Sequence, residues 1–554
     1  MERITISTPS AYRSMSIVDA EDGARPYLCP LMNSFVTPSV FFPLLASRPA
    51  AVFPRFRGAD ERAMLRGCRA GSVLASRRWF GSGASFDVVS PADGATVVAT
   101  VSADDDVSVA TKFCGAVQAQ RGWRTMPWED RAALMGTFAE RLHDCAGDIS
   151  RIITSETGKP LTQSRAEVNA AARRVRAMVD LSERARARME SNSVRDSSGS
   201  VTEKVVHEPV GVVAHVSAWN YPAFLAVNVL VPALLAGNAV LHKPSEHSPG
   251  VGERLRTLLL QSDVPPDVFQ VCQGGRDVGR ALVRLQGLGA VAFTGSREAG
   301  TEVAAVAARS HTRAILELGG VDGAYVRRDV ADLERAAASV ASGAYYNAGQ
   351  GCCAIERVYV HRDVYESFVE ALVSEAAKLR AGDPADETTT LGPLVSREAL
   401  RRVEAHVNDA VRSGASVLFR GKAPAEGYFH PAMVVGGDAL RGSQRARLMT
   451  RAESFAPVAA VIPVHDDEEA IEAMNDTSYG LTASVYTSDG AAAESILGRL
   501  DVGTGYWNAC NVPSANLPWT GRRGSGGGSG GCTLGEEGYT SFTRPKALYM
   551  RSRA

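Results

Sequence analysis

The chain has 554 residues, of which 45% are hydrophobic and 22% are charged, as is typical of a globular protein. Its 60 basic and 61 acidic residues nearly cancel, which argues against a binder of nucleic acids or membrane surfaces. One hydrophobic core rarely serves so long a chain, so we expect two or three domains. The nine cysteines lack metal-ligand spacing, and they indicate reduced thiols in an intracellular compartment and no metal site.

Residues 1–85 are rich in Pro, Ser and Arg and show no sustained helical or strand period. We expect an N-terminal extension there, which is either a targeting segment or a disordered or loosely attached one. Four acidic residues are unusual for a mitochondrial presequence, so a cytoplasmic and a mitochondrial location both stay open. These residues are Glu2, Asp19, Glu21 and Asp22.

From Phe86 onward, short β-branched runs alternate with helical stretches. Residues 210–216, 238–243, 268–272 and 289–293 are strand candidates, and helices are expected to begin near Pro222 and Pro249. This alternation predicts an α/β fold with a parallel sheet covered by helices on both faces, which binds ligands beyond the carboxyl ends of its strands. A second alternating block spans residues 323–512, and the Gly-rich segment 521–531 is expected to be a flexible loop.

The longest apolar run, residues 224–241, could be mistaken for a membrane span. Asn228, Pro232 and Gly237 interrupt it. We therefore expect a buried helix that leads into a buried strand, and no integral membrane segment.

Polar residues follow several of these predicted strands. Gly295 and Ser296 stand where a strand turns into a helix, so free N–H groups there could meet a phosphate, although an ordinary helix cap would look the same. Lys243 and Glu246 could bind the hydroxyls of a ribose, or could form a surface turn. The Asn220 amide could donate to a developing oxyanion, or could serve a turn before proline.

Two further residues could carry covalent chemistry. Glu317 is a carboxylate in an apolar strand, where desolvation raises the pKa toward that of a useful base, and a structural ion pair is the alternative. Cys352 and Cys353 follow a Gly-Gln-Gly approach to an expected helix start, where partial positive charge favours a thiolate. A buried, inert thiol is the more common role of a single cysteine.

In this order, these elements resemble the aldehyde dehydrogenase superfamily over residues 86–554. The matching motifs include TSETGKP (154–160), AWNYP (218–222), HKPSE (242–246), FTGS (293–296), LELGG (316–320), GQGCCA (349–354) and ESFAPV (453–458). Later matches are NDTSYGLTASVYT (475–487), VGTGYWN (502–508) and PWTG (518–521). Each motif is weak alone, and ten in the family's order are specific.

The resemblance implies a Rossmann-like NAD(P)-binding domain, an α/β catalytic domain and a β oligomerisation arm. The NAD-binding domain would comprise residues 86–184 and 210–319, and the catalytic domain residues 320–532. The arm and tail would comprise residues 185–209 and 533–554. The resemblance also implies a homodimer or homotetramer.

It further implies roles for single residues. Cys352, rather than Cys353, would attack the aldehyde to give a thiohemiacetal and then a thioester, Asn220 would hold the oxyanion, and Glu317 would activate the hydrolytic water. NAD would be favoured over NADP, because the Glu246 carboxylate would repel a 2′-phosphate. The residues implied to bind the cofactor are Trp219, Lys243, Glu246, Gly295, Ser296, Leu318, Glu453 and Phe455.

Some residues depart from the family pattern, and other functions stay open. A glutamate frequent in the family's C-terminal segment is Thr533 here, and a frequent glycine is Ala456. A CoA-acylating or phosphorylating dehydrogenase would share the fold, although a deacylating base such as Glu317 is needed only when water accepts the acyl group. A non-catalytic structural relative is the remaining alternative.

Overall fold

The computed structural model describes residues 84–191, 194–196, 201–442 and 446–551. The chain divides into two compact units, Met1–Arg66 and Gly67–Ala554. The first unit, and with it nearly all of the expected N-terminal extension of residues 1–85, lies outside the described residues. Within the described ranges, no helix is long and apolar enough to cross a membrane.

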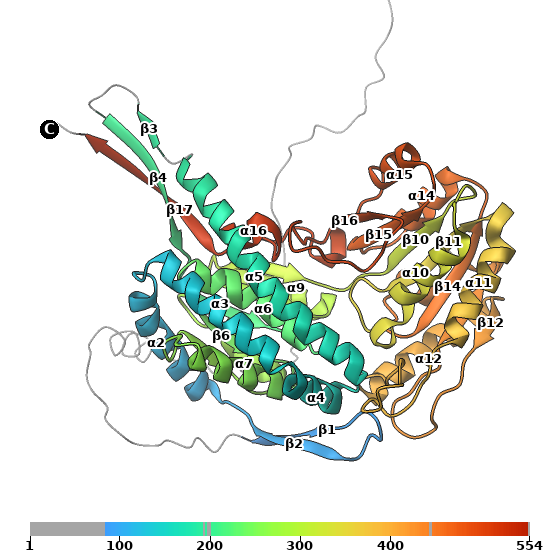
Figure 1. Cartoon of the computed structure of the whole chain (residues 1–554), viewed down its shortest axis with the longest axis horizontal. Helices are drawn as coiled ribbons and strands as arrows, with labels where there is room; N and C mark the ends of the chain where they lie inside the picture. The colour runs from blue at the N-terminus through green and yellow to red at the C-terminus, as the bar shows by residue number, and fades with distance from the viewer. Residues whose placement is uncertain (1–83, 192–193, 197–200, 443–445, 552–554) are drawn as a thin grey trace, which may run out of the picture. The chain divides into compact units, whose positions relative to one another are not determined.

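Five parallel strands form the first sheet, in the order β7-β6-β5-β8-β9. They are β5 (Val212–Val216), β6 (Ala239–Lys243), β7 (Phe269–Val271), β8 (Ala290–Thr294) and β9 (Arg313–Glu317). The helices of this region are α2 (Asp106–Trp123), α3 (Trp128–Asp144), α4 (Ala146–Thr157), α5 (Leu161–Ser191), α6 (Pro222–Leu235), α7 (Pro249–Gln261), α8 (Arg276–Val283) and α9 (Arg297–Arg309) (Figure 1).

Side chains of the central strand alternate between two hydrophobic clusters. Val212 and Ala214 on β5 pack in one cluster with residues of α2 and α8. Val213, between them, packs in the other cluster with residues of α6 and α7. Successive side chains of a strand point to opposite faces, so both faces of this sheet are covered by helices, as predicted from the sequence.

Seven strands form the second sheet, in the order β12-β13-β14-β11-β10-β15-β16, with only β12 antiparallel to its neighbour. They are β10 (Asp322–Val326), β11 (Ile355–His361), β12 (Ser416–Arg420), β13 (Met433–Gly436), β14 (Val458–Val464), β15 (Thr482–Tyr486) and β16 (Thr504–Trp507). The α-helices are α10 (Leu333–Tyr345), α11 (Tyr365–Ala377), α12 (Arg397–Arg412), α13 (Arg447–Arg451), α14 (Asp467–Asn475) and α15 (Gly490–Leu497). Short 3-10 helices are η1 (Tyr346–Gly349), η2 (Arg362–Val364), η3 (Asp438–Leu440) and η4 (Arg523–Ser525).

Two smaller antiparallel sheets complete the described chain. Strands β1 (Ser85–Val89) and β2 (Val97–Ser102) pair with each other. Strands β3 (Val194–Asp196), β4 (Val201–Pro209) and β17 (Thr543–Arg551) form a sheet that extends away from helix α5 (Figure 1), and α16 (Gly535–Thr540) precedes β17. The sequence placed the start of this arm at residue 185, whereas residues 185–191 continue helix α5.

The Gly-rich segment 521–531 is not the free loop that its composition predicted. The Ser525 hydroxyl donates to the carbonyl of Gly319 at 2.7 Å and accepts from the Gly480 amide at 3.0 Å. A Cβ atom added at Gly526 would lie 2.4 Å from the Leu316 carbonyl oxygen. The glycines therefore let this segment lie directly against the end of β9, because a larger residue would collide with the strand backbone.

Candidate active site

The carboxyl ends of β5, β6, β8 and β9 meet at one edge of the first sheet, where two cavities lie side by side. One, of about 230 Å³, is lined by Lys243 and Glu246. The other, of about 190 Å³, is lined by Cys352, Glu317 and Asn220. Both cavities are lined by Ala218, Trp219, Thr294 and Gly295, so they form one continuous groove. All eleven site residues predicted from the sequence line this groove, so the tertiary structure brings them together.

Cys352 lies in a turn between η1 and β11. The preceding residues Gly349-Gln350-Gly351 had predicted that it would stand at the start of a helix. Its position depends on close backbone packing: a Cβ atom added at Gly320 would lie 2.3 Å from the Cys352 carbonyl oxygen. At Gly349, where φ is +69°, a Cβ atom would lie 2.2 Å from the Ala456 carbonyl oxygen. The thiol is half-buried and faces the cavity, so an aldehyde carbonyl can reach it.

Asn220 is buried beside this thiol, just before helix α6. Its Nδ2 donates to the Gln350 carbonyl at 3.1 Å, and the Asn347 side chain donates to the Asn220 carbonyl at 3.1 Å. An amide nitrogen carries two hydrogens, so one N–H of Asn220 stays available. The site therefore offers a positioned donor for an oxyanion that forms next to Cys352.

Cys353 points away from the cavity into the core. Its Sγ donates to Oδ1 of Asn511 at 2.9 Å, and the residue is 6% exposed. Its hydrogen bond with Cys352, followed by burial, raises the pKa of the Cys353 thiol well above its usual value. A thiol that stays protonated is a poor nucleophile, so the two adjacent cysteines differ in chemistry as well as in direction.

Glu317 ends strand β9 and is fully buried in the groove. Burial raises the pKa of its carboxyl to about 8, and the hydrogen bond from Thr533 opposes that shift. The Thr533 hydroxyl donates to Oε1 at 3.1 Å, while Oε2 has no hydrogen-bond partner among the described residues. An unpaired carboxylate oxygen with a pKa near neutrality can accept a proton from water.

The far side of the cavity is built from the segment that precedes β14. Oε1 of Glu453 accepts from the Gly320 amide at 3.0 Å, and burial raises the pKa of this carboxyl to about 8. Gly319 allows this approach, because a Cβ atom there would lie 2.3 Å from Oε1 of Glu453. Phe455 adopts a φ of +54°, and its ring meets Trp219 edge to face with centroids 5.7 Å apart.

Two groups of this segment were not predicted from the sequence. The buried Glu356 carboxylate accepts the backbone N–H groups of Ser454 and Phe455 at 2.9 to 3.0 Å, and so fixes the segment that carries Glu453. The charged pair Glu356-Arg357 in a mostly apolar strand, β11, was the available signal. Arg402 also lines the cavity, and nothing in the amphipathic pattern of α12 marks it.

The cavity lined by Lys243 and Glu246 suits the adenosine half of a dinucleotide. Lys243 is buried, and its Nζ contacts the Pro244 carbonyl at 2.9 Å and Glu246 at 3.5 Å. Burial lowers the pKa of Lys243, and the Glu246 carboxylate opposes that shift. Ser296 caps helix α9 by accepting from the Ala299 amide at 3.3 Å, which leaves the first N–H groups of the helix facing the groove. This donor and acceptor set suits ribose hydroxyls and a pyrophosphate.

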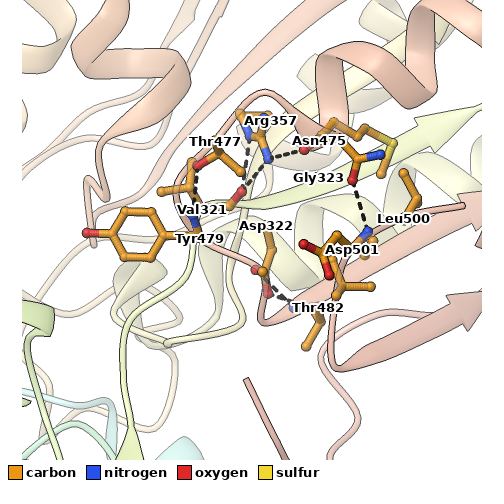
Figure 2. Close-up of a pocket in the computed structure, with 14 residues that line it drawn as sticks. Val321, Asp322, Gly323, Arg357, Asn475, Thr477, Tyr479, Thr482, Leu500 and Asp501 are labelled. Carbon is orange, nitrogen blue, oxygen red and sulfur yellow. Dashed lines mark hydrogen bonds between the residues drawn. The ribbon is translucent and has the colours of Figure 1, made fainter. Parts of the chain in front are cut away.

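A smaller cavity, of about 10 Å³, lies behind the LELGG segment, and Figure 2 shows the side chains around it. The Arg357 guanidinium donates to the Val321 carbonyl at 2.7 Å, and the Thr482 amide donates to the Asp322 carboxylate at 3.1 Å (Figure 2). This space is large enough for about one water molecule and too small for a substrate. Its bonds instead anchor the segment that joins Glu317 to strand β10.

Comparisons with known proteins agree with this geometry. The aldehyde dehydrogenase family model matches residues 79–548. The 3,6-anhydro-alpha-L-galactose dehydrogenase of Streptomyces coelicolor is 33% identical, over 89% of this chain and 98% of that protein. The succinate-semialdehyde dehydrogenase [NADP(+)] of Deinococcus radiodurans is 33% identical, over 84% of this chain and 94% of that protein. A crystal structure of indole-3-acetaldehyde dehydrogenase with NAD+ superimposes with a TM-score of 0.79 at 28% identity, over 84% of this chain and 93% of that one.

The chain therefore belongs to the aldehyde dehydrogenase family. It is an NAD(P)-dependent oxidoreductase that converts an aldehyde to a carboxylic acid.

Proposed function

We propose that the chain oxidises its aldehyde with NAD through covalent chemistry at Cys352, and that water releases the acid. The observation that carries this proposal is the juxtaposition of a half-buried thiol, a buried amide donor and a buried carboxyl in one cavity. The Cys352 sulfur adds to the aldehyde carbon, and the resulting oxyanion receives the free N–H of Asn220. An oxidised nicotinamide, when bound, would accept the hydride that leaves this carbon, so that the acyl group stays on the Cys352 sulfur as a thioester.

Glu317 performs the second half of the reaction. Its unpaired Oε2 accepts a proton from water, the water oxygen attacks the thioester carbon, and the Cys352 sulfur leaves as a thiolate. Neither CoA nor phosphate is needed when a base of this kind activates water. Lys243 and Glu246 would hold the adenosine ribose and Ser296 the pyrophosphate, while Leu318 and Trp219 line the groove. Glu453 would hold the nicotinamide ribose, and Phe455 would flank it.

Glu246 supports NAD as the preferred cofactor. Its carboxylate lies in the adenosine cavity, paired with Lys243 at 3.5 Å. A 2′-phosphate placed beside this carboxylate would meet like charge, while the hydroxyl of NAD would find an acceptor.

Product analysis with purified enzyme tests the proposal. An aldehyde panel with NAD should give equal amounts of NADH and free acid, whether or not CoA or phosphate is added. With NADP, kcat/KM should fall by roughly tenfold or more, because two like charges about 4 Å apart in water repel each other by on the order of 1 kcal/mol. Formation of acyl-CoA or acyl phosphate would overturn the hydrolytic route, and equal use of NADP would overturn the role of Glu246.

We infer that the antiparallel sheet of β3, β4 and β17 joins copies of this chain into a homodimer or homotetramer. Val205 on β4 and Tyr549 and Met550 on β17 are exposed, and apolar residues on an extended sheet are typical of an interface. Light scattering of purified protein should therefore give twice or four times the mass of one chain. Changing Tyr549 and Met550 to Lys should reduce that mass, and a monomeric wild type would contradict the inference.

A further inference from the structure

Arg174 on helix α5 is a buried cation whose hydrogen bonds are incomplete. It is 7% exposed, and its guanidinium lies 3.8 Å from the centre of the Phe224 ring. Nη1 donates to Oδ1 of Asn228 at 3.2 Å, and Nη2 donates to the carbonyl of Pro513. A guanidinium has five N–H donors, so three of them have no acceptor among the described residues.

Two other buried arginines show what a purely structural guanidinium looks like in this fold. Arg357 donates to three backbone carbonyls and to the Tyr359 hydroxyl. Arg131 donates to three backbone carbonyls, those of Leu235, Trp123 and Met126. Arg131 binds three acceptors and Arg357 four, so Arg174, with two, binds the fewest of these buried arginines.

Arg174 also lacks a counter-ion. Among the described residues, no carboxylate oxygen lies within 4.0 Å of its guanidinium nitrogens. The nearest acidic residues of α5 are Asp180, six residues away and exposed, and Glu167, seven residues away and bound to Lys159. Burial without such a partner lowers the pKa of Arg174 to about 9. Arg131 and Arg357 have no carboxylate this close among the described residues either, but three and four acceptors receive their hydrogen bonds, whereas Arg174 has two. An uncompensated buried charge is costly, and a bound anion would relieve that cost at Arg174.

The partners of Arg174 lie on two segments that lead to the catalytic residues, helix α6 and the loop after β16. Phe224 and Asn228 lie on helix α6, which begins at Pro222 directly after Asn220 and Tyr221. Asn228 is about 9 Å along the helix axis from Pro222. Pro513 belongs to the loop after β16, and Asn511 of the same loop accepts the hydrogen bond from Cys353. Arg174 thus bridges the helix that positions Asn220 and the loop that contacts the residue next to Cys352.

We propose that Arg174 binds the carboxylate of an aldehyde substrate, so that this enzyme selects aldehydes that carry a carboxylate at the end remote from the reacting carbonyl. The inference rests on the proposed function, because it assumes that Cys352 receives the aldehyde end. A carboxylate offers two oxygens in the geometry of the guanidinium fork, and it would satisfy the open N–H donors and the missing counter-charge together.

Matched substrate pairs test this assignment. Succinic semialdehyde is compared with butanal, and adipic semialdehyde with hexanal, in wild type and in Arg174→Met. The neighbouring Arg173→Met serves as control, because Arg173 lies on the same helix with its side chain exposed. For at least one pair, wild type should prefer the carboxylated aldehyde. Arg174→Met should lower kcat/KM for that aldehyde by roughly 10- to 100-fold, the range expected for a lost hydrogen-bonded charge, while butanal and hexanal change by about threefold or less.

A binding measurement separates recognition from structure. Succinate and adipate should slow alkylation of Cys352 by iodoacetamide in wild type and in Arg173→Met, and should not do so in Arg174→Met. Arg174→Lys, which restores a cation, should regain part of both effects. An equal fall of kcat/KM for carboxylated and neutral aldehydes in Arg174→Met would overturn the assignment, and so would a wild type that prefers the neutral member of both pairs. Failure to oxidise any of the four aldehydes would instead count against the proposed function.

Discussion

Replacing Cys352 with Ala is expected to abolish aldehyde oxidation, with kcat lowered by roughly 10⁴-fold or more, as for other enzymes that lose their nucleophile. Replacing the adjacent Cys353 with Ala should leave most of the activity. The physical reason is direction and ionisation: the Cys352 thiol faces the cavity, whereas the Cys353 thiol is buried, held by Asn511, and kept protonated by its raised pKa. Only the first can add to a carbonyl carbon.

The measurement is NADH formation with the aldehyde that wild type uses best. The control for folding is NAD binding to both variants, measured as quenching of tryptophan fluorescence. Neither thiol lines the adenosine cavity, so both variants should still bind NAD. Mass spectrometry after brief alkylation should locate the label on Cys352 in wild type and in Cys353→Ala. If Cys353→Ala lost its activity and Cys352→Ala kept it, the assignment of the two thiols would be reversed.

Replacing Glu317 with Gln is expected to separate acylation from deacylation. The variant keeps the thiol and the amide donor, so it should release one rapid equivalent of NADH per active site. Steady turnover should then fall by about 10²- to 10⁴-fold, the usual effect of losing a general base. In wild type, hydrolysis should speed up as pH rises through about 8, because burial raises the pKa of Glu317 and the carboxyl is a base only after it has lost its proton.

Stopped-flow recording between pH 6 and 10 gives the amplitude of the NADH burst and the rate of steady turnover. This interval extends about two pH units on each side of the Glu317 pKa. Glu317→Gln should show no pH-dependent step in that interval. Thr533→Val removes the hydroxyl that donates to the Glu317 carboxylate. The midpoint of the pH dependence of steady turnover should therefore move to higher pH in this variant, without loss of the burst. A variant Glu317→Gln that lost burst and turnover equally would contradict a role confined to deacylation.

Much of the fold could be predicted from the sequence, because local patterns are strong in a parallel α/β sheet. The β-branched runs at residues 210–216, 238–243, 268–272 and 289–293 became β5, β6, β7 and β8. The apolar run 224–241 became helix α6 followed by strand β6, with no membrane-crossing helix in the described ranges. Burial on both faces of a sheet requires apolar residues at nearly every position, and that requirement is visible in the sequence.

The predictions that were wrong concern segments whose conformation depends on contacts with residues far away in the sequence. Gly349 and Gly351 suggested a helix start at Cys352, whereas contacts with Gly320 and Ala456 hold a turn there. The glycines of 521–531 suggested flexibility, whereas they allow close packing on β9. In both cases glycine in the sequence indicated a flexible local backbone. In the structure the glycines instead allow another segment of the chain to pack closely, because glycine has no Cβ atom.

The sequence by itself determined which groups stand at the strand ends: a thiol, an amide, a carboxyl and a lysine, in the order of one enzyme family. Only the tertiary structure decided that Cys353 turns away, and that one oxygen of Glu317 has no hydrogen-bond partner and Arg174 no counter-ion among the residues that the structure describes. The reason is physical. The identity of a group is a property of its residue, whereas its burial, its partners and the pKa that follows depend on residues hundreds of positions away in the chain.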